Sequence, residues 1–249
     1  MGVHVGRPAA IQPIASVSQR HLAYYRMFGS AFLLSTIVLG VSTADRLPYF
    51  VFLTNWVAVL NFAYFTVAAV ATYRDSARGA RAAHIMSQVC LPNAIMVTLI
   101  YWLFVHPFIP AGRLSQIMLV RNVIDHGVTL LFLVADFLLC ETLFVIKEFY
   151  FPTIVALYIP FSAAWTFLTG KKVYPMLTFR SVRSYGFLVA SVLTSLVAFA
   201  AVVWIGPYVK RAVCNDDVPC SKNDEVDVEM GEDGATPSSD SNSDVEGGQ

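Results

Sequence analysis

One apolar stretch of the sequence, "RNVIDHGVTLLFLVADFLL", carries polar residues whose types are suited to acid–base chemistry. They are Arg121, Asn122, Asp125, His126 and Asp136. An imidazole titrates near neutral pH, so His126 is suited to act as a general acid or base. Ionisable groups within a membrane-buried segment indicate a functional site by default. The other interpretation of a single intramembrane histidine is a hydrogen bond that joins two helices.

The polar residues of this stretch fall into two sets. Residues 122, 126, 129, 133 and 136 follow spacings of four and three, which places them on one face of a helix. Four of the five are polar, so we expect this face to point into the bundle or a watery cavity. Arg121 and Asp125, four residues apart, predict an ion pair at the membrane interface.

A base needs a group to activate, and "YFVFLTNW" offers Thr54, followed by Asn55. If both helices start at the non-cytoplasmic side, Thr54 lies about 8 Å and His126 about 13 Å deep, at about 1.5 Å per residue. The two side chains then share a leaflet. The alternative for Thr54 is the usual hydrogen bond of a helical threonine to its own i−4 carbonyl.

The elements that position these groups are predicted to be membrane-spanning helices. The chain is 56% hydrophobic and only 14% charged, which favours an all-α, polytopic membrane helix bundle over a soluble domain. Crossing a hydrocarbon core takes roughly 20 apolar residues. Six stretches qualify: about 25–43, 49–72, 84–105, 117–140, 150–169 and 186–207.

Charge divides the chain into a basic body and an acidic tail. Sixteen of the 17 basic residues but only six of the 17 acidic residues precede Cys214, so the zero net charge hides +10 against −10. We predict an N-terminal arm (1–24), a six-helix membrane domain (25–210) and a disordered acidic tail (211–249). The tail is a solvated spacer or a trafficking or phosphorylation segment. The scattered positive charge forms no aromatic-interleaved patch, so nucleic-acid binding is not expected.

Basic residues near the first helices predict that both termini are cytoplasmic and the four cysteines reduced. Lys171, Lys172, Arg180 and Arg183 oppose this orientation, because they would lie on the far side. No secretory signal pattern precedes the first span. The predicted location is a multi-pass protein of the endoplasmic reticulum or plasma membrane; no feature indicates an oligomeric state.

Several short segments together resemble the androgen-induced-gene family of integral membrane proteins, including the androgen-dependent regulators of tissue factor pathway inhibitor. The likeness covers most of residues 50–180: "FLTNW", "CLPNAIMVTLIYW", "NVIDHGVTLLFLVAD" and "KVYPML" are similar to family segments in the same order. The sequence departs from the pattern at Val123, where a second histidine is frequent, and at Asp136, where the family has Glu. Its segment from Thr54 to Pro92 is also shorter.

The resemblance implies a threonine hydrolase of fatty acid esters of hydroxy fatty acids, with Thr54 as nucleophile and His126 as base. Such a reaction needs no metal or cofactor; its partners are the bilayer and a lipid ester. Asn122, one turn from the histidine, is expected to orient it, and Asn55 is a candidate oxyanion donor. Asp136 lies about 15 Å along the helix from His126, which excludes a simple Thr-His-Asp triad.

Two other classes of function remain open. A channel, transporter or lipid-binding protein would use His126 and Asp136 as a polar or proton path. An assembly protein would need no chemistry. No G-x-S-x-G, H-E-x-x-H, G-x-x-x-x-G-K or G-x-G-x-x-G motif occurs, so serine hydrolase, zincin and nucleotide-binding functions have no motif support.

Overall fold

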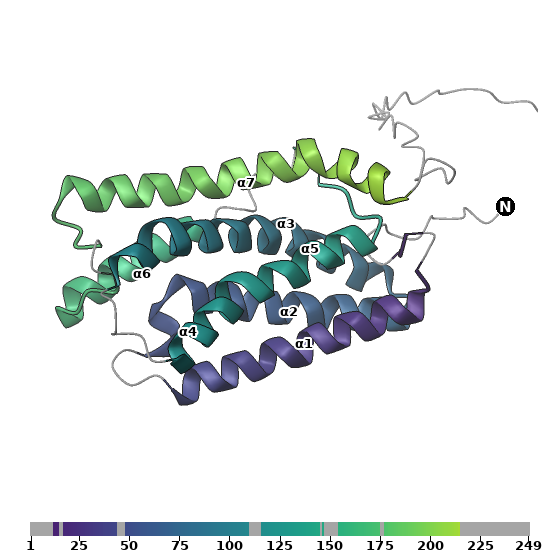
Figure 1. The fold of residues 1–249 in the computed structure, drawn as a ribbon, viewed down its shortest axis with the longest axis horizontal. Coiled ribbons are helices and arrows are strands. Elements are labelled where there is room, and N and C mark those ends of the chain that lie inside the picture. Colours follow the sequence, from purple (N-terminus) through teal and green to yellow (C-terminus); the bar gives the residue numbers. More distant parts are fainter. Residues whose placement is uncertain are drawn as a thin grey trace, which may run out of the picture.

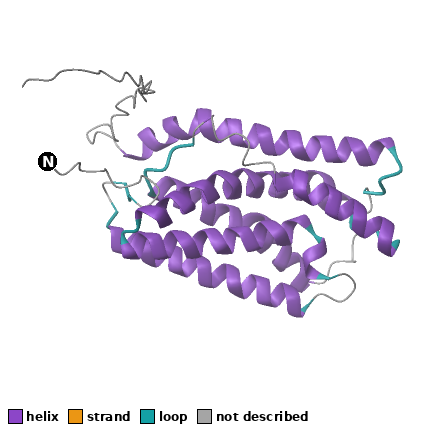
Figure 2. Cartoon of the chain, turned by 180° about the vertical axis from the view of Figure 1, so that it is seen from behind, coloured by secondary structure: helices purple, strands orange, loops and turns teal. Residues whose placement is uncertain are grey.

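The structure is a computed structural model that describes residues 12–14, 17–43, 48–109, 116–144, 146, 154–174 and 177–214. In these residues the chain forms helices and loops and no strand (Figure 2). The helices are α1 (Gln19–Ser42), α2 (Leu53–Arg74), α3 (Ala77–Ile100), α4 (Gln116–Val123), α5 (Thr129–Leu139), α6 (Ile154–Thr169) and α7 (Val182–Cys214). The predicted all-α membrane bundle is confirmed. The acidic tail after Cys214 lies outside the described residues.

Shorter helical turns extend several of these helices. A 3₁₀ turn at Tyr49–Val51 precedes α2, and another at His106–Phe108 follows α3. A π-helical turn, Tyr101–Val105, continues α3, and a second one, Ile124–Val128, joins α4 to α5. The α3 helix with its π turn and the α4–α5 unit are therefore each one continuous rod.

Among the residues that the structure describes, five helical segments are long and apolar enough to cross a membrane. They are α1, α2, α3 with its π turn, the α4–α5 unit and α7. The fifth predicted span, 150–169, corresponds to α6, whose 16 residues are fewer than the roughly 20 that cross a bilayer.

Helix ends differ from the predicted spans because capping residues, not hydropathy, set where a helix begins. Helix α1 begins at Gln19, where the Ser18 hydroxyl accepts a hydrogen bond from the His21 amide at 3.2 Å. Helix α3 begins at Ala77, where Ser76 caps the Gly79 amide at 3.3 Å. Hydropathy detects only the apolar portion of each helix, so these polar first turns were missed.

The helices lie side by side along the long axis of the molecule (Figure 1). Helix α2 contacts α1 and α3, α3 also contacts α7, and α5 lies against α1 and α3. Among the five spanning segments, α2 and α3 are the most buried. Fully buried apolar side chains such as Phe65 of α2 and Phe199 of α7 form part of the core of the bundle.

The start of α1 and the end of α7 lie at the same end of the bundle (Figure 1). Hydrogen bonds tie this end together: the Ile14 amide donates to the Leu139 carbonyl at 3.1 Å. The buried ammonium of Lys210 in α7 donates to the carbonyls of Cys140, at 2.7 Å, and Thr142. The segment that follows α5 therefore joins the beginning and the end of the helical body.

Candidate functional site

A cavity of about 480 Å³ lies where the first turn of α2 meets the end of α3, the α4–α5 unit, α6 and the start of α7. Most of its walls are apolar, with a few polar groups among them, as is usual for ligand sites. Four of the five predicted site residues line it: Thr54, Asn55, Asn122 and His126. Asp136 is not among its lining residues.

Thr54 is the second residue of α2, and its hydroxyl is not used in the way usual for a membrane helix. Its i−4 carbonyl, that of Phe50, accepts a hydrogen bond from the Trp56 indole at 2.6 Å. In the described part of the chain, no hydrogen bond joins the Thr54 hydroxyl to a backbone carbonyl. Five other helical threonines do make the i−4 bond: Thr66, Thr72, Thr166, Thr169 and Thr194. The Thr54 hydroxyl is therefore left to the side chains that line the cavity.

Two tyrosines surround the first turn of α2. The Tyr174 hydroxyl accepts a hydrogen bond from the Leu53 amide at 3.3 Å, and the Tyr158 hydroxyl donates to the Val51 carbonyl at 2.6 Å. Burial raises the pKa of Tyr174, against the lowering effect of hydrogen bonds with Leu53, Tyr158 and Thr54. Tyr174 is thus a protonated hydroxyl beside Thr54.

The site residues Tyr158 and Tyr174 were not predicted as functional from the sequence. Tyr174 lies in "KVYPML", one of the segments that carry the family likeness, so a signal for it existed. Nothing in the local pattern gave it a chemical role, because its partners come from α2, more than a hundred residues away in the sequence.

Asn55 is buried, and its side-chain amide donates to the Tyr49 carbonyl at 2.5 Å. This hydrogen bond closes the 3₁₀ turn that precedes α2 and fixes the position of Thr54. One of the two N–H groups of the Asn55 side-chain amide is therefore occupied, and the second is the one that Asn55 can offer to a ligand.

His126 lies in the π turn Ile124–Val128 with 5% of its surface exposed. The Thr129 amide closes this turn on the Ile124 carbonyl, which also accepts a hydrogen bond from the Thr129 hydroxyl at 3.1 Å. The predicted polar face is the inner face of the helix: residues 126, 129, 133 and 136 are buried and Asn122 is half-buried. Gly127, the next residue, has open space around its α-carbon.

The imidazole of His126 is held by a ring contact. Its ring stacks on Tyr101, with centroids 3.9 Å apart and planes 4° from parallel. The buried Nδ1 atom has no hydrogen-bond partner among the described residues. Asn122, the residue expected to orient the histidine, makes no hydrogen bond to it in this part of the chain.

The Arg121–Asp125 pair forms as predicted, with 3.3 Å between Arg121 Nε and Asp125 Oδ2. Arg121 also donates to the Thr43 hydroxyl at 3.1 Å and lies 6.0 Å from the centre of the Tyr49 ring. Burial, followed by the charge of Asp125, raises the pKa of Tyr49 to about 12, so this ring stays neutral. The pair is partly exposed and lines the cavity together with Asn122.

Asp136 forms a buried ion pair with Arg26 of α1. Arg26 Nε lies 2.7 Å from Asp136 Oδ1 and Nη2 lies 3.1 Å from Oδ2, and both residues are fully buried. The Tyr64 hydroxyl also donates to this carboxylate, and Arg26 Nη1 donates to the Thr72 hydroxyl at 2.6 Å. The predicted first span, about 25–43, puts Arg26 at its very start. Helix α1 instead begins at Gln19, seven residues before Arg26, which places Arg26 inside the bundle.

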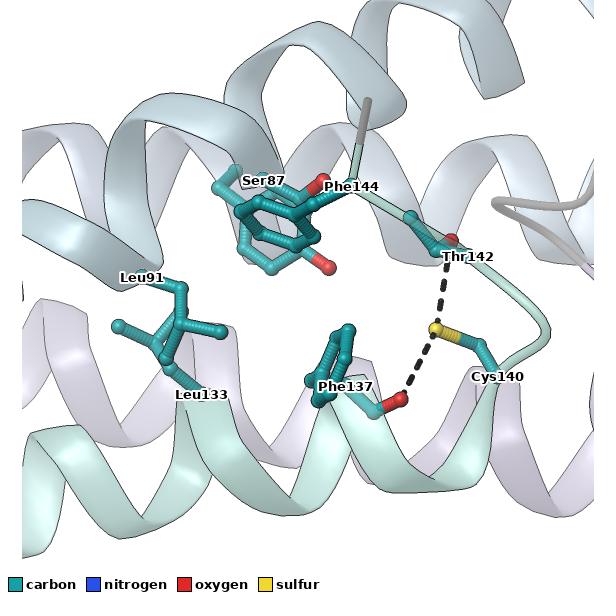
Figure 3. A pocket seen from close by; sticks show the side chains of 8 residues that line it. Ser87, Leu91, Leu133, Phe137, Cys140, Thr142 and Phe144 are labelled. Atoms are coloured by element: carbon teal, nitrogen blue, oxygen red, sulfur yellow. Dashed lines mark hydrogen bonds between the residues drawn. The ribbon is translucent and has the colours of Figure 1, made fainter. Parts of the chain in front are cut away.

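A second cavity adjoins this network but holds only about 10 Å³, room for roughly one water molecule. Leu91, Leu133, Phe137 and Phe144 crowd around it (Figure 3). The Cys140 thiol at its edge is directed to the Thr142 hydroxyl at 3.4 Å (Figure 3). This cavity is too small for an organic ligand, which leaves the larger one as the candidate site.

In the residues that the structure describes, no group of three or more His, Cys, Asp or Glu side chains is placed to hold a metal ion. A comparison of the chain with protein families, with curated proteins and with solved structures found no match to any of them.

Proposed function

We propose that the protein is a membrane-embedded hydrolase of lipid esters, with Thr54 as nucleophile and His126 as general base. The observation that carries this proposal is that both side chains line one cavity, although 71 positions separate them in the sequence. Fatty acid esters of hydroxy fatty acids, the substrate class that the family resemblance implies, suit a cavity with mainly apolar walls.

The proposed reaction has two stages. His126 takes the Thr54 hydroxyl proton as Oγ1 attacks the ester carbonyl carbon, and then gives that proton to the departing alkoxide. Water next attacks the acyl-threonine and loses a proton to His126, which returns it to Thr54 Oγ1 as the carboxylic acid leaves. We assign proton transfer to Nε2, because Nδ1 is fully buried.

The negative oxygen formed in each stage needs a hydrogen-bond donor. Tyr174 is the strongest candidate, because it is protonated and its hydroxyl lies at the first turn of α2, 3.3 Å from the Leu53 amide nitrogen. Its ring contacts Phe52 and Phe187, which hold the hydroxyl in place at the cavity wall. The free amide N–H of Asn55 is a second candidate donor.

The alternative, a channel or transporter with a path through His126 and Asp136, gains no support from the described residues. His126 faces the large cavity, whereas Asp136 is enclosed by Arg26 and Tyr64. A carboxylate that accepts three hydrogen bonds within the bundle serves as a structural anchor.

A fluorophosphonate probe on the full-length protein in membranes tests the proposal. We expect the wild type to react and Thr54→Ala and His126→Ala to lose labelling and ester hydrolysis together. Thr194→Ala is the matched control: it removes a threonine hydroxyl from α7 that bonds the Ala190 carbonyl and does not line the cavity. Labelling that survives Thr54→Ala would show that another residue is the nucleophile.

A further inference from the structure

The two π-helical turns of the bundle lie at one place, beside the large cavity. Tyr101 begins the turn that continues α3, and His126 is the middle residue of the turn between α4 and α5. The α3 helix contacts this second turn directly. A π turn inserts an extra residue into a helix and changes the direction in which the following side chains point, and such turns are frequent at functional sites.

The result of this arrangement is a parallel stack of two buried rings. The Tyr101 and His126 centroids are 3.9 Å apart with planes 4° from parallel, and each residue is at least nine-tenths buried. Both residues line the cavity. The contact therefore covers one face of the imidazole at the wall of the cavity.

A catalytic histidine is usually oriented by a hydrogen bond from its second ring nitrogen to a third group. Here Nδ1 is buried and has no partner in the described structure. Rotation about the bond to the imidazole is broad and roughly two-fold when nothing fixes the ring. A flat partner at van der Waals distance restricts that rotation without a hydrogen bond.

We propose that Tyr101 is a positioning residue for His126, which fixes the plane of the imidazole by stacking in place of the hydrogen-bonded third group. The proposal rests on the function proposed for His126. Tyr101 does not touch the reacting atoms; it acts through the histidine. Its hydroxyl lies 3.5 Å from Nδ1 of His106, at the limit of a hydrogen bond, so the ring is the part that matters.

Substitutions at position 101 separate the ring from the hydroxyl. In Tyr101→Leu the stack is lost, and we expect the probe to label Thr54 at least about tenfold more slowly, since small misplacements of a catalytic group have effects of this size. Tyr101→Phe keeps the ring and should recover most of that rate. Tyr24→Leu, which removes an exposed tyrosine from α1, serves as the control for general damage.

Magnetic resonance gives a readout that does not depend on activity. The chain has five histidines, so ¹³C-histidine labelling of the full-length protein in lipid nanodiscs gives few ring signals. The signal of a ring stacked on tyrosine is shifted upfield. The variants His126→Gln and His106→Gln each remove one histidine signal and so assign it. We expect the His126 shift to survive Tyr101→Phe and to disappear in Tyr101→Leu, or in Tyr101→Met if the leucine variant does not fold.

The outcomes distinguish the two proposals. A wild-type protein that does not react with the fluorophosphonate probe, but whose His126 signal is shifted, would overturn the proposed hydrolase function and leave the stacking in place. Thr54- and His126-dependent labelling that is unchanged in Tyr101→Leu would overturn the positioning role alone. If Tyr101→Phe is as slow as Tyr101→Leu, the hydroxyl rather than the stack orients the histidine, which also contradicts the inference.

Discussion

At the scale of single residues, what distinguishes Thr54 is its place in the first turn of its helix. Threonines deeper in a helix find a carbonyl four residues back and donate to it, which satisfies the hydroxyl. Four residues before Thr54 the chain is a 3₁₀ turn whose carbonyl is bonded to the Trp56 indole. The Thr54 hydroxyl is thus left to side chains from other parts of the chain, among them Tyr174 in the segment between α6 and α7.

The proposed role of Tyr174 as oxyanion donor gives a residue-scale prediction. Tyr174→Phe should lower kcat for ester hydrolysis by roughly a hundredfold, the usual effect of removing one oxyanion donor, with a much smaller change in KM. Steady-state kinetics on the purified protein would measure both constants.

Tyr64→Phe is the matched control for this prediction, because it also removes a buried tyrosine hydroxyl but lies in the Asp136 network, away from the large cavity. It should keep its kcat. Equal losses of kcat in the two variants would mean that Tyr174 acts on the fold and not on the reaction.

The sequence predicted some of these residues and not others, for a physical reason. His126 and Asp136 were conspicuous because charged or titratable groups are costly inside a membrane. Tyr101 and Tyr174 were not conspicuous, since the role of a tyrosine depends on which residue faces it. Thr54 was a candidate because it shares a predicted depth with His126, but its own pattern favoured an ordinary backbone hydrogen bond, and the family resemblance gave it the role of nucleophile.

At the scale of helices, the Arg26–Asp136 ion pair fastens α1 to α5, and through Tyr64 and Thr72 it fastens both to α2. Aromatic rings extend the same contact, with Tyr25 and Phe32 of α1 stacked on Phe132 of α5. A charge pair inside a bundle gives the helices one register, because any other register would leave both charges without partners.

Removal of one partner should therefore destabilise the bundle strongly. We expect Asp136→Asn to lower the free energy of unfolding by about 3 kcal/mol, since it leaves the Arg26 charge buried without compensation. Thermal unfolding in detergent would measure the loss, and Arg20→Met, at an exposed arginine of α1, is the control.

The double variant Arg26→Met, Asp136→Leu removes both charges and should lose less stability than Asp136→Asn, because apolar groups of similar volume often replace a buried pair without great loss. An Asp136→Asn protein as stable as the wild type would contradict the structural role. The sequence analysis identified Asp136 but not its partner, because the N-cap at Ser18 that carries Arg26 into the bundle was not recognised.

At the scale of the whole molecule, the chain returns to the end where α1 starts (Figure 1). The six predicted spans imply an even number of crossings, and the structure places the short α6 where the fifth span was expected. Hydropathy was sufficient for this overall plan, because apolar length is what a bilayer selects. The cavity could not be predicted from hydropathy, since its shape depends on how several helices pack against one another.

Because α1 starts and α7 ends at the same end of the bundle, we predict that both termini lie on one side of the membrane. The distribution of basic residues predicts that this is the cytoplasmic side. Epitope tags at residue 1 and residue 249 should show the same protease sensitivity in sealed vesicles, with both lost from vesicles whose cytoplasmic face is outward. One protected and one digested tag would require an odd number of crossings.

Lys210 has a practical consequence for anyone who shortens or tags this chain. Its ammonium joins α7 to the Cys140–Thr142 segment and rests 4.2 Å from the centre of the Phe137 ring. The last turns of α7 are thus part of the folded body, although they extend beyond the stretch that hydropathy identified. A fusion partner should therefore be attached after Cys214. One attached a single turn earlier would disturb the contacts that Lys210 makes with the Cys140–Thr142 segment.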